Sequence, residues 1–210
     1  DKREARKICH IPQESKSYLV MGGSMGFGKI QIFVLELARR MEADENMVVI
    51  CGNNKKLETL LKRELVHRKN VRVLGYTDQV AAYMAACDVI FTKPGGLSST
   101  EAAVMGIPMV HTNPIPGCET KNVEFFQKHG MSIGKRSFVG QVRAGEKLLE
   151  REKLRVEMQE AQKKNSRPEA AERICKLLEE LIGKANEMIQ YTRDEKRFES
   201  TERNKGENER

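Results

Sequence analysis

The sequence predicts an α/β protein with a doubly wound, mostly parallel sheet of six strands. Short apolar runs alternate with segments that carry apolar residues at helical spacing, and this alternation is repeated along the first 135 residues. Several runs are rich in β-branched residues with little polar alternation, which is typical of parallel strands covered on both faces. The expected strands are SYLVMGG (17–23), NMVVICG (46–52), NVRVLGY (70–76), CDVIFTKP (87–94), IPMVHTN (107–113) and MSIGK (131–135).

The segments between these runs are expected to be helices. They cover residues 31–41, 55–65, 78–87, 98–106 and 119–130, and two more helices follow at about 140–164 and 168–190. Pro168 stands in the first turn of the last helix, where proline is tolerated. We therefore expect a linker over residues 1–16, one domain over 17–190 and a polar, disordered tail over 191–210.

Composition narrows the classes of function. No apolar run approaches the roughly 20 residues that a membrane-spanning helix needs. The five cysteines form no CxxC pair, so neither a zinc site nor a disulfide framework is indicated. A net charge of +7 suits an anionic partner, but 5% aromatic residues and no tryptophan argue against nucleic acid.

Four distinctive loops follow four of the expected strands. GGSMGFG follows the first strand, GYTDQV the third, KPGGLSSTE the fourth and NPIPGCETKN the fifth. In an open parallel sheet, ligands bind beyond the carboxyl ends of the strands. The four loops together therefore predict a ligand site at that edge.

The first of these loops fits a phosphate. Its glycines let the backbone approach a ligand, and the helix that follows offers free N–H groups to an anion; a tight turn without a ligand is the alternative. The spacing from Gly23 to Lys29 also matches the GxxxxGK of a P-loop. That motif requires serine or threonine next, whereas the chain has Ile30, so a P-loop is disfavoured.

The fourth loop combines a proline–glycine turn with hydroxyl side chains that can cap a helix. Glu101 is expected in the first turn of that helix, where the dipole favours a carboxylate. It is either a capping residue or an acceptor for two ribose hydroxyls, and spacing alone does not choose between them. His111 is the histidine nearest this edge, and a packing role is expected for it.

Three segments in order carry a family resemblance: YLVMGGSMGFGKI, GYTDQVAAYMAACDVIFTKPGGLSSTEAAVMGIPMV and PIPGCETKNVEFF. They resemble the C-terminal domain of GT-B glycosyltransferases of family 28, especially monogalactosyldiacylglycerol synthases and processive diacylglycerol glucosyltransferases. The peptidoglycan enzyme that transfers N-acetylglucosamine is similar at a greater distance. The similarity runs from about residue 17 to residue 135.

The resemblance implies a site for a UDP-sugar and assigns residues to its parts. These are Gly22, Gly23, Ser24 and Gly26 for the diphosphate; Gly75, Tyr76, Thr77 and Val80 for uracil; Gly95, Gly96, Leu97, Ser98 and Ser99 for the phosphates; Glu101 for ribose; and Cys118, Glu119 and Asn122 for the hexose. Cys118 stands where the family commonly has glutamine, a much better hydrogen-bonding group than a thiol. The resemblance therefore leaves the choice of hexose open.

The resemblance also implies that a preceding N-terminal domain supplies the catalytic base and the lipid acceptor. No catalytic residue, metal ligand or cofactor is then expected in this chain, which alone would be inactive. The full-length enzyme would transfer glucose or galactose to a diacylglycerol-type lipid, in the cytoplasm and peripheral to the inner face of the membrane. N-acetylglucosaminyl transfer to a lipid-linked peptidoglycan precursor, a non-catalytic nucleotide-binding or nucleotide-sugar-binding module, and a magnesium-dependent P-loop phosphotransferase stay open as alternatives.

Overall fold

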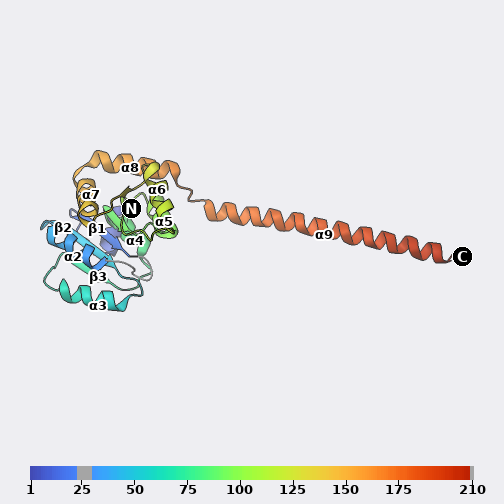
Figure 1. Cartoon of the computed structure of the whole chain (residues 1–210), viewed down its shortest axis with the longest axis horizontal. Coiled ribbons are helices and arrows are strands. Elements are labelled where there is room, and N and C mark those ends of the chain that lie inside the picture. Colours follow the sequence, from blue (N-terminus) through green and yellow to red (C-terminus); the bar gives the residue numbers. More distant parts are fainter. Residues whose placement is uncertain (23–29, 209–210) are drawn as a thin grey trace. The chain divides into compact units, whose positions relative to one another are not determined.

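The computed structural model describes the backbone of residues 1–22 and 30–208 and the side chains of residues 1–22 and 30–191 (Figure 1). The chain divides into two compact units, residues 1–166 and 167–210. The strands are β1 (Lys16–Met21), β2 (Glu45–Ile50), β3 (Val71–Leu74), β4 (Val89–Thr92), β5 (Met109–His111) and β6 (Ile133–Gly134). The helices of the first unit are α1 (Lys2–Ile8), α2 (Ile30–Arg40), α3 (Lys55–Glu64), α4 (Val80–Ala86), α5 (Gly96–Val104), α6 (Thr120–Lys128), α7 (Phe138–Glu150) and α8 (Glu152–Asn165).

The sheet confirms the predicted fold class. Its six strands lie in the order β3-β2-β1-β4-β5-β6, and all neighbouring strands are parallel. The order reverses between β1 and β4, which pair through Tyr18 and Val89. The carboxyl ends of β1 and β4, Met21 and Thr92, therefore lie side by side, the arrangement in which doubly wound sheets bind ligands.

Apolar side chains cover both faces of the sheet. Along β1, Tyr18 and Val20 enter one buried cluster, with side chains from α2, α3 and α7. The alternate residues Leu19 and Met21 enter a second cluster, with side chains from α1, α4, α5 and α6. This period of two explains why the strands read as continuous apolar runs.

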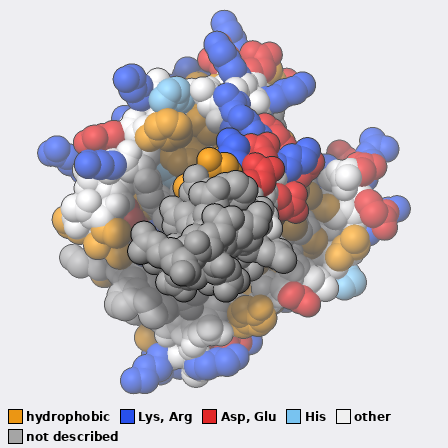
Figure 2. All heavy atoms as spheres, turned by 90° about the vertical axis from the view of Figure 1, so that its right-hand side faces the viewer, with side chains coloured by type: hydrophobic (Ala, Val, Ile, Leu, Met, Phe, Trp, Pro, Cys, Tyr) orange, Lys and Arg blue, Asp and Glu red, His pale blue; other side chains and the backbone are white. Residues whose placement is uncertain are grey.

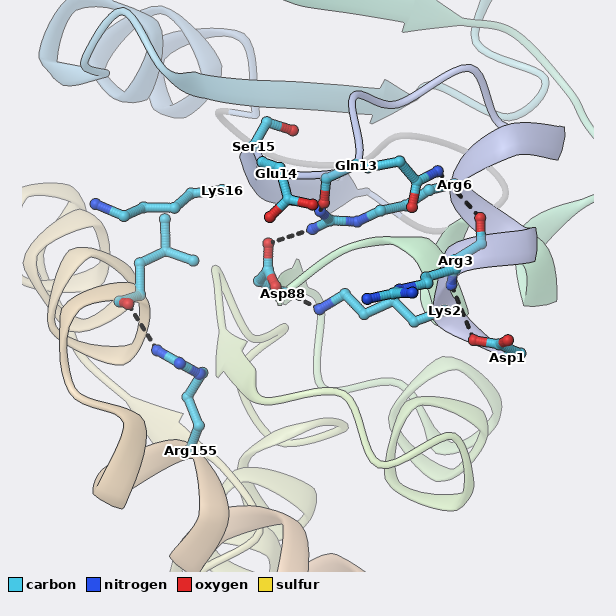
Figure 3. Close-up of a pocket in the computed structure, with 11 residues that line it drawn as sticks. Asp1, Lys2, Arg3, Arg6, Gln13, Glu14, Ser15, Lys16, Asp88 and Arg155 are labelled. Atoms are coloured by element: carbon cyan, nitrogen blue, oxygen red, sulfur yellow. Dashed lines mark hydrogen bonds and ion pairs between the residues drawn. The ribbon is translucent and has the colours of Figure 1, made fainter.

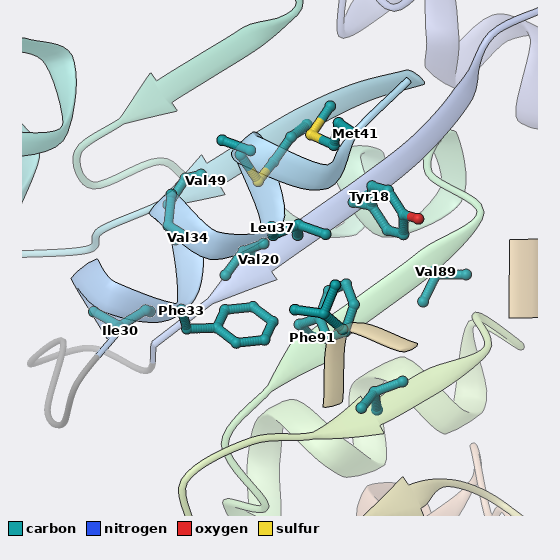
Figure 4. Close-up of a cluster of buried hydrophobic side chains, with 14 of the residues drawn as sticks. Tyr18, Val20, Ile30, Phe33, Val34, Leu37, Met41, Val49, Val89 and Phe91 are labelled. Atoms are coloured by element: carbon teal, nitrogen blue, oxygen red, sulfur yellow. The ribbon is translucent and has the colours of Figure 1, made fainter. Parts of the chain in front are cut away.

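Phe91 of β4 occupies the middle of the first cluster (Figure 4). Its ring lies 5.6 Å from the ring of Tyr18 and 4.9 Å from that of Phe33, measured between centroids. Gly145 of α7 lies against the same ring, because a Cβ atom there would come within 2.2 Å of Phe91 Cζ. The helix can therefore approach the sheet closely only with glycine at this position.

The first 16 residues, which were expected to be a linker, pack against the sheet and its helices. Helix α1 brings Ala5 into the second cluster, and Arg6 is 5% exposed. Arg6 Nη2 lies 3.0 Å from Asp88 Oδ2, and Arg6 Nε donates to the Ala86 carbonyl at 3.0 Å. Asp88 also accepts from the Ser17 amide at 2.8 Å. This segment, expected to be a linker with one short turn, is therefore packed into the first unit.

The helix expected at 140–164 is two helices, α7 and α8. The chain turns at Arg151, whose φ of −108° and ψ of 94° are extended. Arg155 Nη1 donates to the carbonyls of Leu148 and Leu149 at 2.8 and 2.6 Å, which satisfies acceptors at the end of α7. The break has no glycine or proline to mark it in the sequence.

The second unit contains α9 (Ala170–Asn208). The helix continues beyond Tyr191, where the composition predicted disorder, because glutamate, lysine and arginine are good helix formers. Its apolar residues between 174 and 189, among them Leu177 and Leu181, are exposed.

No described helix is long and apolar enough to cross a membrane. Charged side chains of both signs are mixed on the face drawn in Figure 2.

Candidate functional site

A cavity of about 190 Å³ lies at the carboxyl ends of β1 and β2. The last residues of these strands, Met21 and Ile50, form part of its wall. Its other lining residues come from the loops after β2 and β3 and from the starts of α4 and α5: Gly52, Asn53, Tyr76, Thr77, Val80 and Ser98. Four of the predicted site residues, Tyr76, Thr77, Val80 and Ser98, are thus brought together although 22 positions separate the first from the last.

Gly75, the first residue of the loop after β3, lies against the end of the Glu58 side chain. A Cβ atom on Gly75 would lie 2.5 Å from Glu58 Oε2. The Glu58 carboxylate contacts Lys62 at 2.8 Å and Lys55 at 3.1 Å. The hydrogen bond from Lys62, and after it the one from Lys55, lowers the pKa of Glu58 from its ordinary value. Glu58 of α3 therefore lies against this loop, which presents Tyr76, a residue that is 71% exposed, to the cavity.

Helix α5 begins without a side-chain cap. Its N-cap is Gly95, and the first amide bonded to it is that of Ser99, at 3.2 Å. The expected caps have other partners. Thr100 Oγ1 donates to the Gly96 carbonyl at 2.7 Å, and the buried Ser99 hydroxyl lies 3.1 Å from His111 Nε2. In the described part of the chain no side chain caps the first-turn amides, which are therefore available to an anion.

Glu101 is the sixth residue of α5 and not part of its first turn, so the interpretation as a capping residue is wrong. Its carboxylate is exposed and has no hydrogen-bond partner among the described residues. Leu97 is 81% exposed at the start of the same helix. An unpaired carboxylate beside free amides can accept hydrogen bonds from hydroxyl groups of a ligand.

The loop after β5 is anchored by buried polar contacts. Glu119 is 6% exposed; its Oε1 lies 3.0 Å from Lys93 Nζ and its Oε2 accepts from the Ile115 amide at 2.8 Å. Asn122 Nδ2 donates to the Pro94 carbonyl at 2.8 Å. Cys118 is exposed. Two of the three residues assigned to the hexose thus have protein partners, and the third is an exposed thiol.

Three predicted site residues, Gly23, Ser24 and Gly26, lie outside the described residues. Gly22 is buried at the end of β1. Sequence reasoning missed Asn53 in the cavity wall and Lys93 beneath the loops. The available signals were the polar pair that follows the second strand and the lysine directly before the proline–glycine turn.

His111 has the packing role that was expected for it. It is 1% exposed, and its two ring nitrogens lie 3.1 Å from the hydroxyls of Ser99 and Ser132. Burial lowers the pKa of His111 to about 4, so the ring is neutral at pH 7. The neutral ring connects the start of α5 to the segment before β6.

A larger cavity, of about 780 Å³, lies at the opposite edge of the sheet, near the amino ends of β1 and β4 (Figure 3). Several of its cations already have protein partners. Lys2 and Arg6 both contact Asp88, and Arg155 contacts the carbonyls of α7. Among the described residues, no group of three histidine, cysteine or acidic side chains could hold a metal ion.

Comparison with known proteins identifies a family. Residues 1–165 match the family described as glycosyl transferases group 1. The chain is 33% identical over 123 residues to a processive diacylglycerol beta-glucosyltransferase of Staphylococcus carnosus, covering 58% of this chain and 31% of that protein. It is 34% identical over 130 residues to the Bacillus subtilis protein of the same name, covering 60% and 33%. The chain spans about a third of the length of these relatives.

Two solved structures share the fold. MurG of Acinetobacter baumannii has a TM-score of 0.68 and 20% identity, with 80% of this chain and 50% of that chain covered. S. aureus MnaA, solved with UDP, has a TM-score of 0.67 and 18% identity, with 87% and 50% covered. These likenesses agree with the predicted GT-B architecture.

Proposed function

The chain belongs to the family of glycosyl transferases group 1, and we propose that it is the donor-binding domain of an enzyme that transfers a hexose from a UDP-hexose to an acceptor. The acceptor is a diacylglycerol-type lipid, as the names of the relatives from S. carnosus and B. subtilis suggest. The segments PGG…E and PGxExxN support a place in family 28. The hexose is glucose or galactose.

The observation that carries this proposal is the uncapped start of α5 beside the unpaired Glu101 carboxylate. The amides of Gly96, Leu97 and Ser98 suit a diphosphate, and Glu101 suits a ribose diol. Tyr76, Thr77 and Val80 line the adjoining cavity, which takes the uracil. One edge of the sheet then offers a place for each part of UDP.

In the proposed reaction, an acceptor hydroxyl oxygen forms a bond to the anomeric carbon of the sugar. The bond from that carbon to the diphosphate oxygen breaks, and UDP leaves with the electron pair. The hydroxyl proton goes to a base in a preceding domain. The dipole and amides of α5 stabilise the charge that develops on the departing diphosphate, so donor binding needs no metal ion or other cofactor.

The full-length enzyme would bind its lipid acceptor at the cytoplasmic surface of a membrane, as a peripheral protein, whereas this chain alone would bind the donor without turnover. A non-catalytic UDP-binding module predicts the same binding. An assay of a longer form of the protein distinguishes the enzyme from the binding module: only the enzyme would transfer labelled hexose to diacylglycerol in vesicles.

Calorimetric titration of this chain with UDP, UDP-glucose, UDP-galactose and ATP, with and without magnesium, tests the proposal. We expect UDP binding that EDTA does not abolish. The substitution Glu101→Ala should weaken it by roughly 10- to 100-fold, because a charge-assisted hydrogen-bond pair is lost. Glu160→Ala, which removes an exposed carboxylate from α8, is the control. A preference for magnesium-ATP, or UDP binding indifferent to Glu101, would refute this function.

A further inference from the structure

We propose that Lys93, Glu119 and Asn122 are positioning residues that form a clamp between the loops after β4 and β5. The clamp holds the start of α5 in the place that the donor diphosphate requires. This inference rests on the proposed function and changes one part of it, because Glu119 and Asn122 then act on the donor through the protein and not by touching the hexose.

Glu119 is the centre of the clamp, because it joins both loops. Its Oε1 contacts Lys93 Nζ at 3.0 Å, and its Oε2 accepts from the Ile115 amide at 2.8 Å. The Glu119 amide in turn donates to the Ile115 carbonyl at 2.9 Å. The loop after β5 is therefore closed on itself by two bonds, and the same side chain ties it to the end of β4.

The second tie lies next to the turn that begins α5. Asn122 Nδ2, in the first turn of α6, donates to the Pro94 carbonyl at 2.8 Å. A Cβ atom placed on the next residue, Gly95, would lie 4.0 Å from Glu119 Oε1. The clamp thus bonds to Lys93 and to the Pro94 carbonyl, and Glu119 lies close to Gly95, the N-cap of α5. A shift of this turn would move those amides relative to the rest of the site.

Burial makes these ties difficult to replace with water. The side chains of Lys93 and Glu119 are 16% and 8% exposed. Exposed ion pairs contribute little, but removing one partner of a buried pair leaves the other charge without compensation. The Lys93–Glu119 contact is therefore a strong restraint on the position of the turn.

The clamp lies on one side of the point where the strand order reverses. It joins the β4 and β5 loops, whereas the cavity with Tyr76 and Thr77 lies at the ends of β1 and β2. Loss of the clamp should therefore weaken the binding of UDP, whose diphosphate meets the amides directly after this turn, more strongly than that of uridine, which reaches α5 only through Ser98 and Glu101. A purely structural role would weaken neither ligand, or weaken both through unfolding.

The test compares UDP and uridine binding by calorimetry for wild type, Lys93→Met, Glu119→Gln and the double variant. We expect each single variant to bind UDP at least roughly tenfold more weakly, because small displacements of binding groups have large effects. The loss of uridine affinity should be clearly smaller than the loss of UDP affinity. The double variant should bind UDP no more weakly than the worse single variant, because the two residues act as a unit. Lys93→Arg should keep most of the affinity, since it keeps the charge.

Lys121→Met and Glu124→Gln are matched controls, since both side chains are exposed on α6. Equal losses for UDP and uridine, or additive losses in the double variant, would overturn the clamp. Failure of wild type to bind UDP would instead refute the proposed function. In that case hydrogen exchange of the Ile115 amide decides about the clamp: faster exchange in Lys93→Met than in Lys121→Met supports it, and equal exchange overturns it.

Discussion

Replacement of His111 by glutamine should remove a pH-dependent part of the stability of this protein. His111 is buried between the hydroxyls of Ser99 and Ser132. Its imidazole ring and the ring of Phe126 pack edge to face, with their centroids 5.3 Å apart. Its low pKa arises from burial alone, so no neighbouring charge compensates a proton on this ring. Glutamine keeps polar atoms at the site but does not titrate.

The size of the effect follows from the difference between the folded and unfolded states. The pKa of His111 is about 4 in the folded protein, against an ordinary value of 6.5. As the pH drops below 6.5, His111 takes up a proton in the unfolded chain but not yet in the folded protein, so the free energy of unfolding falls. It continues to fall until about pH 4, where His111 is protonated in the folded protein as well. At about 1.4 kcal/mol for each pH unit, the loss reaches about 3 kcal/mol.

Urea denaturation of wild type and His111→Gln, at half-unit steps between pH 7.5 and 4, measures this loss. The stability advantage of wild type should be constant above pH 7 and shrink by about 3 kcal/mol towards pH 4. Carboxylates also contribute to the pH dependence, for example Glu45, whose pKa is raised by burial, but they do so in both proteins and cancel in the difference. His67→Gln, which removes an exposed histidine, is the control. An advantage that does not change with pH would refute the reasoning.

Three further substitutions test other parts of the fold by chemical denaturation. Gly145→Ala should cost about 1–3 kcal/mol, because its methyl group overlaps the ring of Phe91, and a neutral result would contradict the close approach of α7. Asp88→Asn should lower the free energy of unfolding by about 3 kcal/mol or more, because it leaves Arg6 without its carboxylate partner. A much smaller loss would contradict the described attachment of α1. Asn54→Ala should cost about 1 kcal/mol through loss of the cap of α3, and an unchanged midpoint would show that this cap is dispensable.

The sheet could be predicted from the sequence because its strands are local patterns. Each apolar run between turn-forming residues is a strand in the structure, and the parallel order follows from the helices between them. The turn at Arg151 was missed, because its cause is an arginine side chain that bonds to the preceding helix and no residue that breaks helices. The extent of α9 was missed because charged composition is shared by disordered tails and solvated helices.

The candidate site could be predicted as a set of loops but not as a set of contacts. Glycine and serine in a loop after a strand indicate where a ligand can approach, and Tyr76 and Ser98 do meet at one cavity. The partners of individual side chains depend on residues distant in the chain. Glu119 and Lys93 are brought together by the pairing of β4 with β5, and Arg6 and Asp88 by the packing of α1, so neither pair leaves a signal in its own segment.

The reversal of strand order between β1 and β4 places most of the cavity proposed for the base and the loops proposed for the sugar in different halves of the chain. Residues before the reversal, through the loop after β3, form most of the cavity proposed for the base. Residues after it, in the loops that follow β4 and β5, lie where the sugar is proposed to bind. Substitutions in one half need not disturb the other. During evolution, substitutions around residue 118 could therefore change which sugar such proteins bind without changing which nucleotide they bind.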